Sequence, residues 1–392
     1  MNTSKQYSAA SVALVRALTL IALCSVGGCA TTREGPVAGQ EVAFFPSPVS
    51  LAASGEWSLT IQGRVFEPAE HSGGRQALIT WAANTLAPAM AASPADAEQS
   101  ARFRERAGYL LADSAGNTRV TVKVGEQLIP LPASNSAGYF TADIPLSDQQ
   151  VSRLARAGRI SFTTVPGSPG APTFTGAAVV VPAEGLLVVS DVDDTIKVTD
   201  IVDRKQALKN TLLEPFAPVP GMPALYRSWQ AALGPRIHFH IVSAGPWQLN
   251  APLQRFVEEE GFPPFTWTMR SVDISNPAAV VATLTSDPRG FKRQAIQALM
   301  TRFPRRHVLL VGDSGEHDPE VYADIVAEFG DRVDAVFIRN VTEQDCGSER
   351  YQRYQDFVAD LRTTKLSVFR DPGELPPLTP ESPGQALCPP RR

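Results

Sequence analysis

Hydrophobic and polar residues alternate with period two through much of the first half of the chain. This alternation is typical of strands with one buried and one exposed face. Clusters of Gly, Pro, Ser and Asn separate the alternating segments, as turns would. The pattern predicts a mainly β, sandwich-like domain over residues 46–183. The expected strands lie at residues 57–61, 120–124, 139–144, 159–164 and 173–181, and a short helix is expected late in residues 82–111.

The pattern changes after residue 184, where continuous apolar runs of strand length replace the alternation. Between these runs, apolar residues recur with helical spacing, as at Ile296, Leu299, Met300 and Phe303. Fully apolar strands alternating with amphipathic helices indicate a parallel sheet that is covered on both faces. We therefore expect an α/β domain over residues 184–365. Its apolar runs lie at residues 185–190, 237–242, 307–311 and 333–338.

The N-terminus has the pattern of an export signal. Lys5 and Arg16 precede an apolar stretch over residues 17–26 that is too short to span a bilayer. The stretch ends in Val-Gly-Gly-Cys, which resembles a bacterial lipobox, so residues 1–28 are expected to be a lipoprotein signal peptide. Cys29 is then the lipidation site, and its acyl chains would hold the protein on a membrane surface. Simple secretion with cleavage near the same place is the alternative.

The residue after Cys29 is Ala30 rather than Asp, which resembles sorting to the outer membrane of a two-membrane bacterium. The expected location is therefore the cell envelope, lipid-anchored and facing the periplasm. Residues 29–45 are expected to be a tether, and the Pro-rich residues 366–392 a tail without periodic structure.

Composition narrows the class of protein. The 392 residues suit two domains, and the 43% of hydrophobic residues exclude a wholly disordered chain. Lys and Arg (36) nearly balance Asp and Glu (40), so a dedicated nucleic-acid binder is not expected. Of the cysteines outside the signal and the lipidation site, Cys346 and Cys388 could pair as a disulfide or remain free thiols. The sequence contains no Cys-x-x-Cys motif, so a zinc site is not expected.

Polar residues follow the apolar runs of the expected parallel sheet, where such sheets carry their reactive groups. The first run is followed by Asp-Val-Asp-Asp-Thr, the second by a serine, and the third by Gly-Asp-Ser-Gly-Glu-His-Asp. A lysine opens the helix that leads into the third run. The candidate site residues are Asp191, Asp193, Ser243, Lys292, Asp313 and Asp318.

The order, spacing and strand-end placement of these residues resemble the haloacid dehalogenase superfamily of phosphohydrolases. The resemblance implies a Rossmann-like parallel sheet. A carboxylate nucleophile suits phosphoryl transfer, and Asp191 takes that role. Asp193, two residues on, can protonate the leaving oxygen and then activate water. Ser243 and Lys292 would hold the phosphate oxygens.

Mg²⁺ is the expected cofactor, because a cation must offset the repulsion between a carboxylate nucleophile and a phosphate. Asp191, the Asp193 carbonyl, Asp313 and Asp318 are the expected ligands, the last directly or through water. Taken alone, the acidic motif could be a solvated turn or a loop Ca²⁺ site. The presence of Ser243, Lys292 and the later Gly-Asp motif in the same order argues against both alternatives.

Other polar and aromatic residues near the motifs are expected to have structural roles. His238 and His240 alternate on one expected strand and are expected to pack or form hydrogen bonds rather than bind metal. His317 is expected to order its loop. Trp247 could line the pocket or pack in the core.

Longer strings narrow the family. They are SDVDDTIKVT (190–199), GMPALY (221–226), FHIVS (239–243) with PWQL (246–249), and GDSGEHDPEVY (312–322). Together they resemble the actin patch protein family of Mg²⁺-dependent phosphatidate phosphatases. The resemblance implies hydrolysis of phosphatidate to diacylglycerol and phosphate. One departure is Gly245, where the family usually has Ser, and this bears on substrate preference.

The intervals between motifs bear on the size of the substrate. Thr195 to Ser243 and Ser243 to Lys292 each leave just under fifty residues, which includes elements of the sheet itself. Neither interval holds a large cap, so a minimal cap and an open site suited to a membrane-borne phosphomonoester are expected. The alternatives are another lipid or soluble phosphomonoester as substrate, or a non-catalytic envelope lipoprotein with a vestigial phosphatase fold.

Overall fold

The computed structural model describes residues 32–69, 74, 97–272, 288–344, 347–351, 365–375 and 377–378. The expected signal peptide, the lipidation site Cys29, and Cys346 and Cys388 lie outside the described residues. Within the described residues, no helix combines the length and the apolar character that a membrane span requires.

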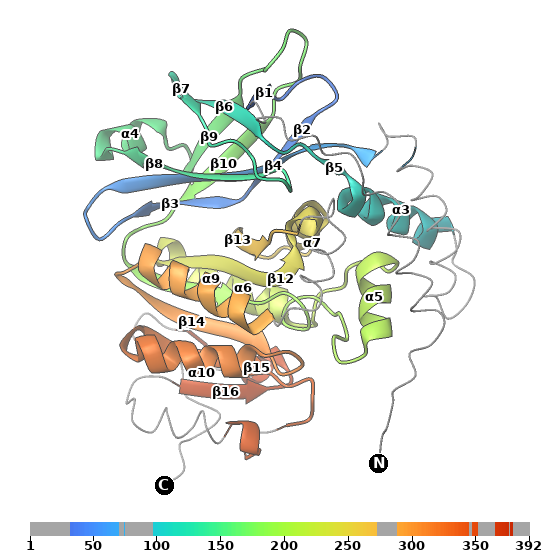
Figure 1. Ribbon diagram of the computed structural model, residues 1–392. Helices are drawn as coiled ribbons and strands as arrows, with labels where there is room; N and C mark the ends of the chain where they lie inside the picture. The colour runs from blue at the N-terminus through green and yellow to red at the C-terminus, as the bar shows by residue number, and fades with distance from the viewer. Residues whose placement is uncertain are drawn as a thin grey trace, which may run out of the picture.

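The N-terminal part is a network of mostly antiparallel strands, and Figure 1 shows β6, β7 and β9 above β3, β4 and β8. Apolar side chains from both levels, such as Ile61 and Phe162, join one buried cluster. Helices α3 (Ala97–Leu111) and α4 (Asp148–Leu154) accompany the strands. The strands are β1 (Arg33–Gly35), β2 (Glu41–Phe45), β3 (Ser47–Leu51), β4 (Trp57–Glu67), β5 (Asp113–Ser114), β6 (Thr118–Val124), β7 (Gln127–Pro130), β8 (Tyr139–Leu146), β9 (Arg159–Thr164) and β10 (Thr175–Val180).

The C-terminal part contains a six-stranded sheet in which every described pair is parallel. Its order is β13-β12-β11-β14-β15-β16, which is the 3-2-1-4-5-6 order of doubly wound sheets. The order reverses between β11 and β14, so polar groups that follow these two strands lie side by side. The strands are β11 (Gly185–Ser190), β12 (Ile237–Pro246), β13 (Phe265–Arg270), β14 (Arg306–Asp313), β15 (Val333–Arg339) and β16 (Lys365–Phe369).

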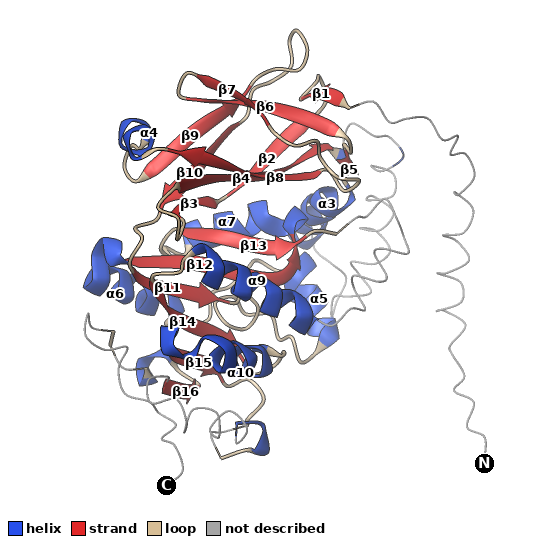
Figure 2. Cartoon of the chain, turned by 60° about the vertical axis from the view of Figure 1, so that its left-hand side comes forward, coloured by secondary structure: helices blue, strands red, loops and turns tan. Residues whose placement is uncertain are grey.

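Helices cover both faces of the parallel sheet, as Figure 2 shows. Val188 and Phe239 point into an apolar cluster shared with α6 and α7, whereas Leu187 and Leu310 point into one shared with α9 and α10. Burial on both faces explains why these strands are continuously apolar in sequence. The helices are α5 (Arg204–Leu212), α6 (Met222–Leu233), α7 (Asn250–Glu259), α9 (Pro288–Arg302) and α10 (Asp318–Phe329), with 3₁₀ turns η2 (Gly234–Arg236), η3 (Trp247–Leu249), η4 (Gly330–Arg332) and η5 (Pro372–Glu374).

The expectation of a mixed α/β fold with a parallel sheet is confirmed. Two end segments differ from the expectation. The expected tether (29–45) contains β1 and β2, because Val42 and Phe45 are buried against β4 and the adjoining core. The expected tail (366–392) begins inside β16, which pairs with β15, and continues into η5. The strands β1, β2 and β16 are too short to show a periodic pattern of apolar residues in the sequence.

The two parts of the chain meet along a packed junction. Trp247 stacks on Phe45 with ring centroids 4.0 Å apart, and the Trp267 backbone N–H donates to the Pro46 carbonyl at 3.1 Å. Arg302 of α9 donates to both carboxylate oxygens of Asp143 on β8, at 3.0 and 2.9 Å. Burial opposes the charge of Asp143, but the Arg302 guanidinium outweighs it and lowers the pKa of this carboxyl.

The Arg302→Ala variant should lose about 1 kcal/mol of unfolding free energy at neutral pH, since the fork to Asp143 is bidentate and partly exposed. A lowered folded-state pKa stabilises the protein above the unfolded pKa and loses that effect as pH falls. The gap between wild type and variant should therefore close below about pH 4. Urea unfolding across pH measures it. Lys123→Ala, which breaks the exposed pair with Glu126, is the control and should change little. A gap that persists in acid would contradict the assignment.

Candidate active site

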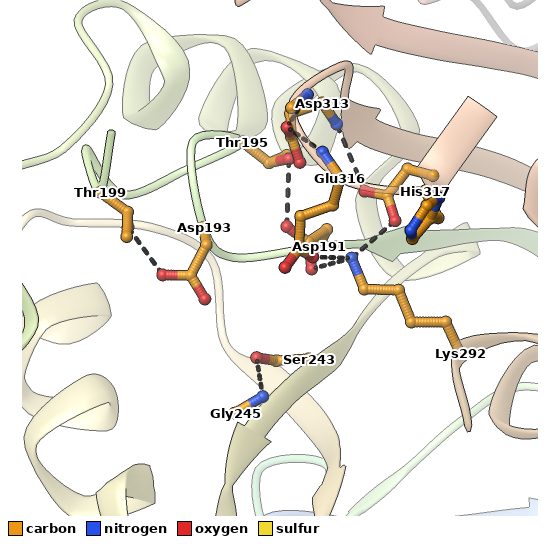
Figure 3. A network of polar contacts seen from close by, with 12 residues as sticks. Asp191, Asp193, Thr195, Thr199, Ser243, Gly245, Lys292, Asp313, Glu316 and His317 are labelled. Carbon is orange, nitrogen blue, oxygen red and sulfur yellow. Dashed lines mark hydrogen bonds and ion pairs between the residues drawn. The ribbon is translucent and has the colours of Figure 1, made fainter. Parts of the chain in front are cut away.

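Three adjacent strands and one helix bring the predicted site residues to one edge of the parallel sheet (Figure 3). Asp191 directly follows β11, and its backbone N–H donates to the Val311 carbonyl of β14 at 2.9 Å. Asp313 is the last residue of β14, and Ser243 lies near the end of β12 on the other side of β11. Carboxyl ends of parallel strands meet at one edge, so residues 122 positions apart in sequence become neighbours.

The Lys292 ammonium is the centre of the site. It lies 2.8 Å from the Asp191 carboxylate, 2.6 Å from Asp318 and 2.9 Å from Glu316. Its side chain is 2% exposed. The long lysine stem carries the charge from α9, on one face of the sheet, to the strand ends. The ammonium of Lys292 is therefore bound by the carboxylates of the site and is not exposed to solvent, although the residue lies near the start of α9.

Negative charge exceeds positive charge in this buried cluster. Asp191, Asp313, Asp318 and Glu316 face the one ammonium of Lys292. Burial raises the pKa of Asp191, Asp313 and Asp318, and their mutual repulsion adds to it, while Lys292 acts in the opposite direction. For Lys292, burial opposes the charge, but the surrounding carboxylates raise its pKa well above the usual value. The cluster favours an additional cation.

The loop between β14 and α10 turns its backbone around Asp313. The Oδ1 atom of Asp313 accepts the N–H groups of Gly315 at 2.5 Å and Glu316 at 3.3 Å. The Asp318 carboxylate in turn accepts the Asp313 N–H at 3.3 Å. A Cβ atom at Gly312 would lie 2.4 Å from that carboxylate, so only glycine allows Asp318 to approach the strand end.

The second oxygen of Asp313 suits a metal ion. Its Oδ2 atom is buried and has no hydrogen-bond partner among the described residues. Oxygen atoms of Asp191, Asp313 and Asp318 all lie within 4.8 Å of one another. Buried carboxylate oxygens without donors are costly unless a cation binds them, and an all-oxygen donor set matches Mg²⁺. The residues present therefore fit a divalent cation.

Asp193 lies apart from the cluster around Lys292 and is paired with a different cation, Lys197. Its Oδ1 atom accepts the Thr199 hydroxyl at 2.6 Å and lies 2.9 Å from the Lys197 ammonium. Burial would raise the pKa of Asp193, but Lys197 and Thr199 together lower it. Lys197 is itself buried and lies 5.2 Å from the centroid of the Phe216 ring. Asp193 is therefore a carboxylate in the free site.

The loop that follows β11 is shaped by Asp194. This residue has a left-handed φ of 52°, and its carboxylate accepts the backbone N–H groups of Thr199, Asp200 and Ile201. Arg339, at the end of β15, donates to the Asp194 carbonyl at 2.7 Å. The Thr195 hydroxyl donates to Asp191 at 3.4 Å. These contacts fix the direction in which Asp191 and Asp193 leave the strand.

Ser243 is buried at the end of β12, and its hydroxyl oxygen accepts the Gly245 N–H at 3.1 Å. The pairing of β12 with β13 shifts register between Ser243 and Pro246, so the chain bulges there. Figure 3 shows this pair below Asp191, with Lys292 to the right of Asp191. The hydroxyl proton of Ser243 remains available to a bound oxyanion.

A cavity of about 570 Å³ opens beside the loop that follows β11. Asp194, Asp200, Val202, Arg339 and Asn340 are among the residues that line it. It lies at the carboxyl ends of β11 and β15, at the same edge of the sheet as Asp313. The side chains of Asp191, Lys292, Asp313 and Asp318 are themselves buried beside it.

Two cations that position the site were not identified from the sequence. Lys197 lies within the string SDVDDTIKVT (190–199), but the sequence patterns assign it no role of its own. Arg350 lies beyond all the motifs, yet it donates to the carbonyls of Ser314 and Glu316 and to the Glu320 carboxylate. It ties the Asp313 loop to α10. No spacing rule identifies such an arginine, because its contacts form only when the chain folds back.

The residues assigned structural roles make structural contacts. His238 and His240 are buried and share the Thr266 hydroxyl, and burial lowers the pKa of His240 to about 3. His317 immediately precedes α10, with its ring 4.0 Å from Glu320. Trp247 packs on Phe45 and also lines a small apolar cavity between the two parts.

Comparison with known proteins identifies relatives of the α/β part. Residues 186–340 match the family described as phosphatidate phosphatase APP1, catalytic domain. Phosphatidate phosphatase APP1 of Saccharomyces cerevisiae is 28% identical over 158 residues, which are 40% of this chain and 26% of that protein. An uncharacterized protein of Schizosaccharomyces pombe is 25% identical over 260 residues, which are 65% of this chain and 40% of the relative. The chain thus spans less than half the length of either relative.

Removing the Arg350 side chain should loosen the Asp313 loop. We expect amide hydrogen exchange at Gly315 and Glu316 to accelerate by about tenfold or more in Arg350→Ala, since several charge-assisted hydrogen bonds are lost. Arg293→Ala, which removes a half-exposed partner of Asp324 and Glu328, is the matched control and should leave these amides unchanged. Unchanged exchange in Arg350→Ala would show that the loop holds its shape without the arginine.

Proposed function

Residues 186–340 belong to the family of the phosphatidate phosphatase APP1 catalytic domain, and from that premise we propose that this chain is a Mg²⁺-dependent phosphatidate phosphatase. The reaction would convert phosphatidate to diacylglycerol and phosphate. The observation that carries the proposal is the convergence of Asp191, Lys292, Asp313 and Asp318 at one edge of the sheet. Such a set supplies a nucleophile, a cation for the phosphate and a metal site.

We further assign the parallel sheet to the haloacid dehalogenase type with a minimal cap. The strand order and the position of Asp191 after the first strand support this assignment. Between Thr195 and Ser243 the described chain forms only α5, α6, η2 and the sheet strand β12. Those elements leave the edge of the sheet open. The proposal keeps residues 46–183 as a separate β domain with a role of its own.

In the first step, a carboxylate oxygen of Asp191 attacks phosphorus and the bond from phosphorus to the diacylglycerol oxygen breaks. The product is an aspartyl phosphate, and the leaving oxygen takes a proton from Asp193. Asp193 is ionised in the free site. A bound phosphate adds negative charge nearby, which raises the proton affinity of Asp193 and prepares it to act as the acid.

In the second step, water attacks the phosphorus of the aspartyl phosphate. Asp193, now a carboxylate, takes a proton from that water, and the bond from phosphorus to Asp191 breaks. Phosphate leaves, and Asp193 returns to solvent one proton, equal to the proton that it takes from solvent when the phosphate group binds, so both carboxylates end ionised as they began. Thr199 and Lys197 hold Asp193 by one oxygen in the free site and so fix its position for both transfers.

The phosphate oxygens would be bound by Lys292 and by the Ser243 hydroxyl, from opposite sides of Asp191. Asp191, Asp313 and Asp318, with the Asp193 carbonyl, would hold Mg²⁺, which would neutralise charge on the phosphate. A Cβ atom at Gly245 would lie 3.2 Å from the Ser243 hydroxyl oxygen, which is a tight contact. The glycine therefore keeps this hydroxyl unobstructed for a phosphate oxygen, which bears on which phosphomonoester fits best.

Asp191→Asn should abolish phosphate release from phosphatidate, with a loss of at least about a thousandfold, and Asp193→Asn should lose about a hundredfold or more. Rates are measured with and without Mg²⁺ on phosphatidate, lysophosphatidate and soluble phosphomonoesters. Asp331→Asn, an exposed acid just ahead of β15 at the opposite edge of the sheet, is the control. Activity that survives Asp191→Asn would reject the mechanism. A wild type that prefers another phosphomonoester would redirect the substrate, and inactivity on all of them would favour a binding protein.

Mg²⁺ should raise the thermal midpoint of the wild type, because a ligand that binds only the folded state stabilises it. Asp313→Asn should lose most of this increase, since it removes a ligand of the proposed metal site, while Asp331→Asn should keep it. Differential scanning calorimetry over a range of Mg²⁺ concentrations tests this without reference to activity. An equal increase in wild type and Asp313→Asn would place the cation elsewhere.

We also propose that Cys29 carries acyl chains that anchor the protein to the cell envelope. The lipobox-like sequence before Cys29 supports this proposal. Mass spectrometry of the mature N-terminal peptide should find an acylated cysteine, and Cys29→Ser should move the protein from the membrane to the soluble fraction. An unmodified N-terminus would leave secretion as the alternative.

A further inference from the structure

Three large hydrophobic side chains stand out as exposed among the described residues: Val202 at 64%, Leu128 at 61% and Leu208 at 54%. Leu128 lies on β7, at the far end of the β part. Val202 and Leu208 lie six residues apart in sequence, on the loop and helix that follow the Asp191 motif. Figure 1 shows that helix, α5, away from β7. Residues 202–208 are called the docking segment below.

Two cations flank the apolar side chains of the docking segment. Arg204 and Lys205 are exposed and lie four and three residues before Leu208 on α5, so they share its side of the helix. Neither makes an ion pair within the described part of the chain. Asp203 accepts the N–H groups of Lys205 and Gln206 and caps the helix, and its exposed carboxylate offsets one of the two cations, so the docking segment has a net charge of +1 (Arg204 and Lys205 against Asp203).

The docking segment is joined directly to the site. The Asp194 carboxylate accepts the Ile201 N–H, so the residue before Val202 is tied to the loop that carries Asp191 and Asp193. Val202 and Asp203 line the same 570 Å³ cavity as Asp194 and Asp200. A surface that binds the docking segment would therefore lie beside the loop that carries Asp191 and Asp193.

We propose that the docking segment binds the surface of an anionic bilayer, with Val202 and Leu208 inserted between lipids and Arg204 and Lys205 at the head groups. The inference rests on the proposed function in one respect, that the substrate is a membrane lipid. Apolar side chains flanked by cations bind anionic interfaces in this way, because both burial and charge favour it. Lysine and arginine stems reach the head groups while the apolar residues lie deeper.

Local charge matters here because the chain as a whole has a formal charge of -4 and gains nothing from long-range attraction to anionic lipid. An acyl anchor would hold the protein near a membrane but would not orient it. The docking segment supplies orientation, since it turns the cavity and the strand ends toward the lipid phosphates. Phosphatidate is itself anionic, so the substrate strengthens the binding.

The first test asks whether the docking segment enters a bilayer, independently of catalysis. The full chain, with Cys24, Cys29, Cys346 and Cys388 replaced by serine, carries a bimane dye at Val202→Cys or, as control, at Leu128→Cys. Both variants are placed with vesicles of phosphatidylcholine and phosphatidylglycerol that contain brominated chains. We expect strong quenching at position 202, none at position 128, and weaker quenching at 202 without phosphatidylglycerol. Equal quenching at both positions, or none at 202, would overturn the proposal.

The second test uses activity. For Val202→Ser/Leu208→Ser, the ratio of the rate on phosphatidate in vesicles to the rate on a soluble phosphomonoester should fall about tenfold, because two apolar side chains no longer enter the bilayer. Leu128→Ser, an equally exposed position, should keep the wild-type ratio. Thermal unfolding confirms that each variant is folded. An unchanged ratio in the double variant would overturn the proposal.

The two tests separate the two proposals. If the chain hydrolyses no phosphatidate but position 202 is quenched, the docking inference holds and the proposed substrate fails. If phosphatidate is hydrolysed but position 202 remains in water, the proposed function holds and the docking inference fails.

Discussion

The site depends on one constraint: several carboxylates are buried around a single ammonium, that of Lys292. Three of them contact it directly, within 2.9 Å. Removing a buried partner of such a cluster leaves uncompensated charge, which costs far more than an exposed ion pair contributes. The fold satisfies this constraint because α9 is placed so that the side chain of Lys292 extends to the carboxyl ends of the strands, where the carboxylates lie. The remaining negative charge leaves room for a divalent cation and a phosphate, and the resting site is poised to bind both.

The acidic loops are held by their own backbones and by two arginines from later in the chain. Asp194 and Asp313 each accept N–H groups from the residues that follow them, and Arg339 and Arg350 bind the carbonyls of the same two loops. Each reactive aspartate is therefore fixed from both sides of its loop. Little rearrangement remains for the moment at which a ligand arrives, so binding free energy is not spent on ordering the loops.

The sequence predicts the sheet well, because strands buried on both faces are continuously apolar, and the runs at 185–190 and 333–338 match β11 and β15 within one residue. It also singles out four residues that the fold brings together: Asp191 and Asp313 at the ends of β11 and β14, and Lys292 and Asp318 on α9 and α10. It misses β2 and β16, whose few residues carry no period, and it misses Lys197 and Arg350. Those two cations act through contacts that depend on the path of the folded chain, which spacing alone does not encode.

The pairing of β11 with β14 has a consequence for the order of assembly. The strands are adjacent in space, but Ser190 and Val311 pair across more than a hundred residues of intervening chain. Contacts of such high sequence separation form slowly, because a long loop must close before they contribute. During synthesis, the segment with Asp191 leaves the ribosome well before its partner strand β14. Asp191 therefore has neither Lys292 nor Asp313 nearby at that stage. The nascent chain is therefore chemically inert until the centre of the sheet closes.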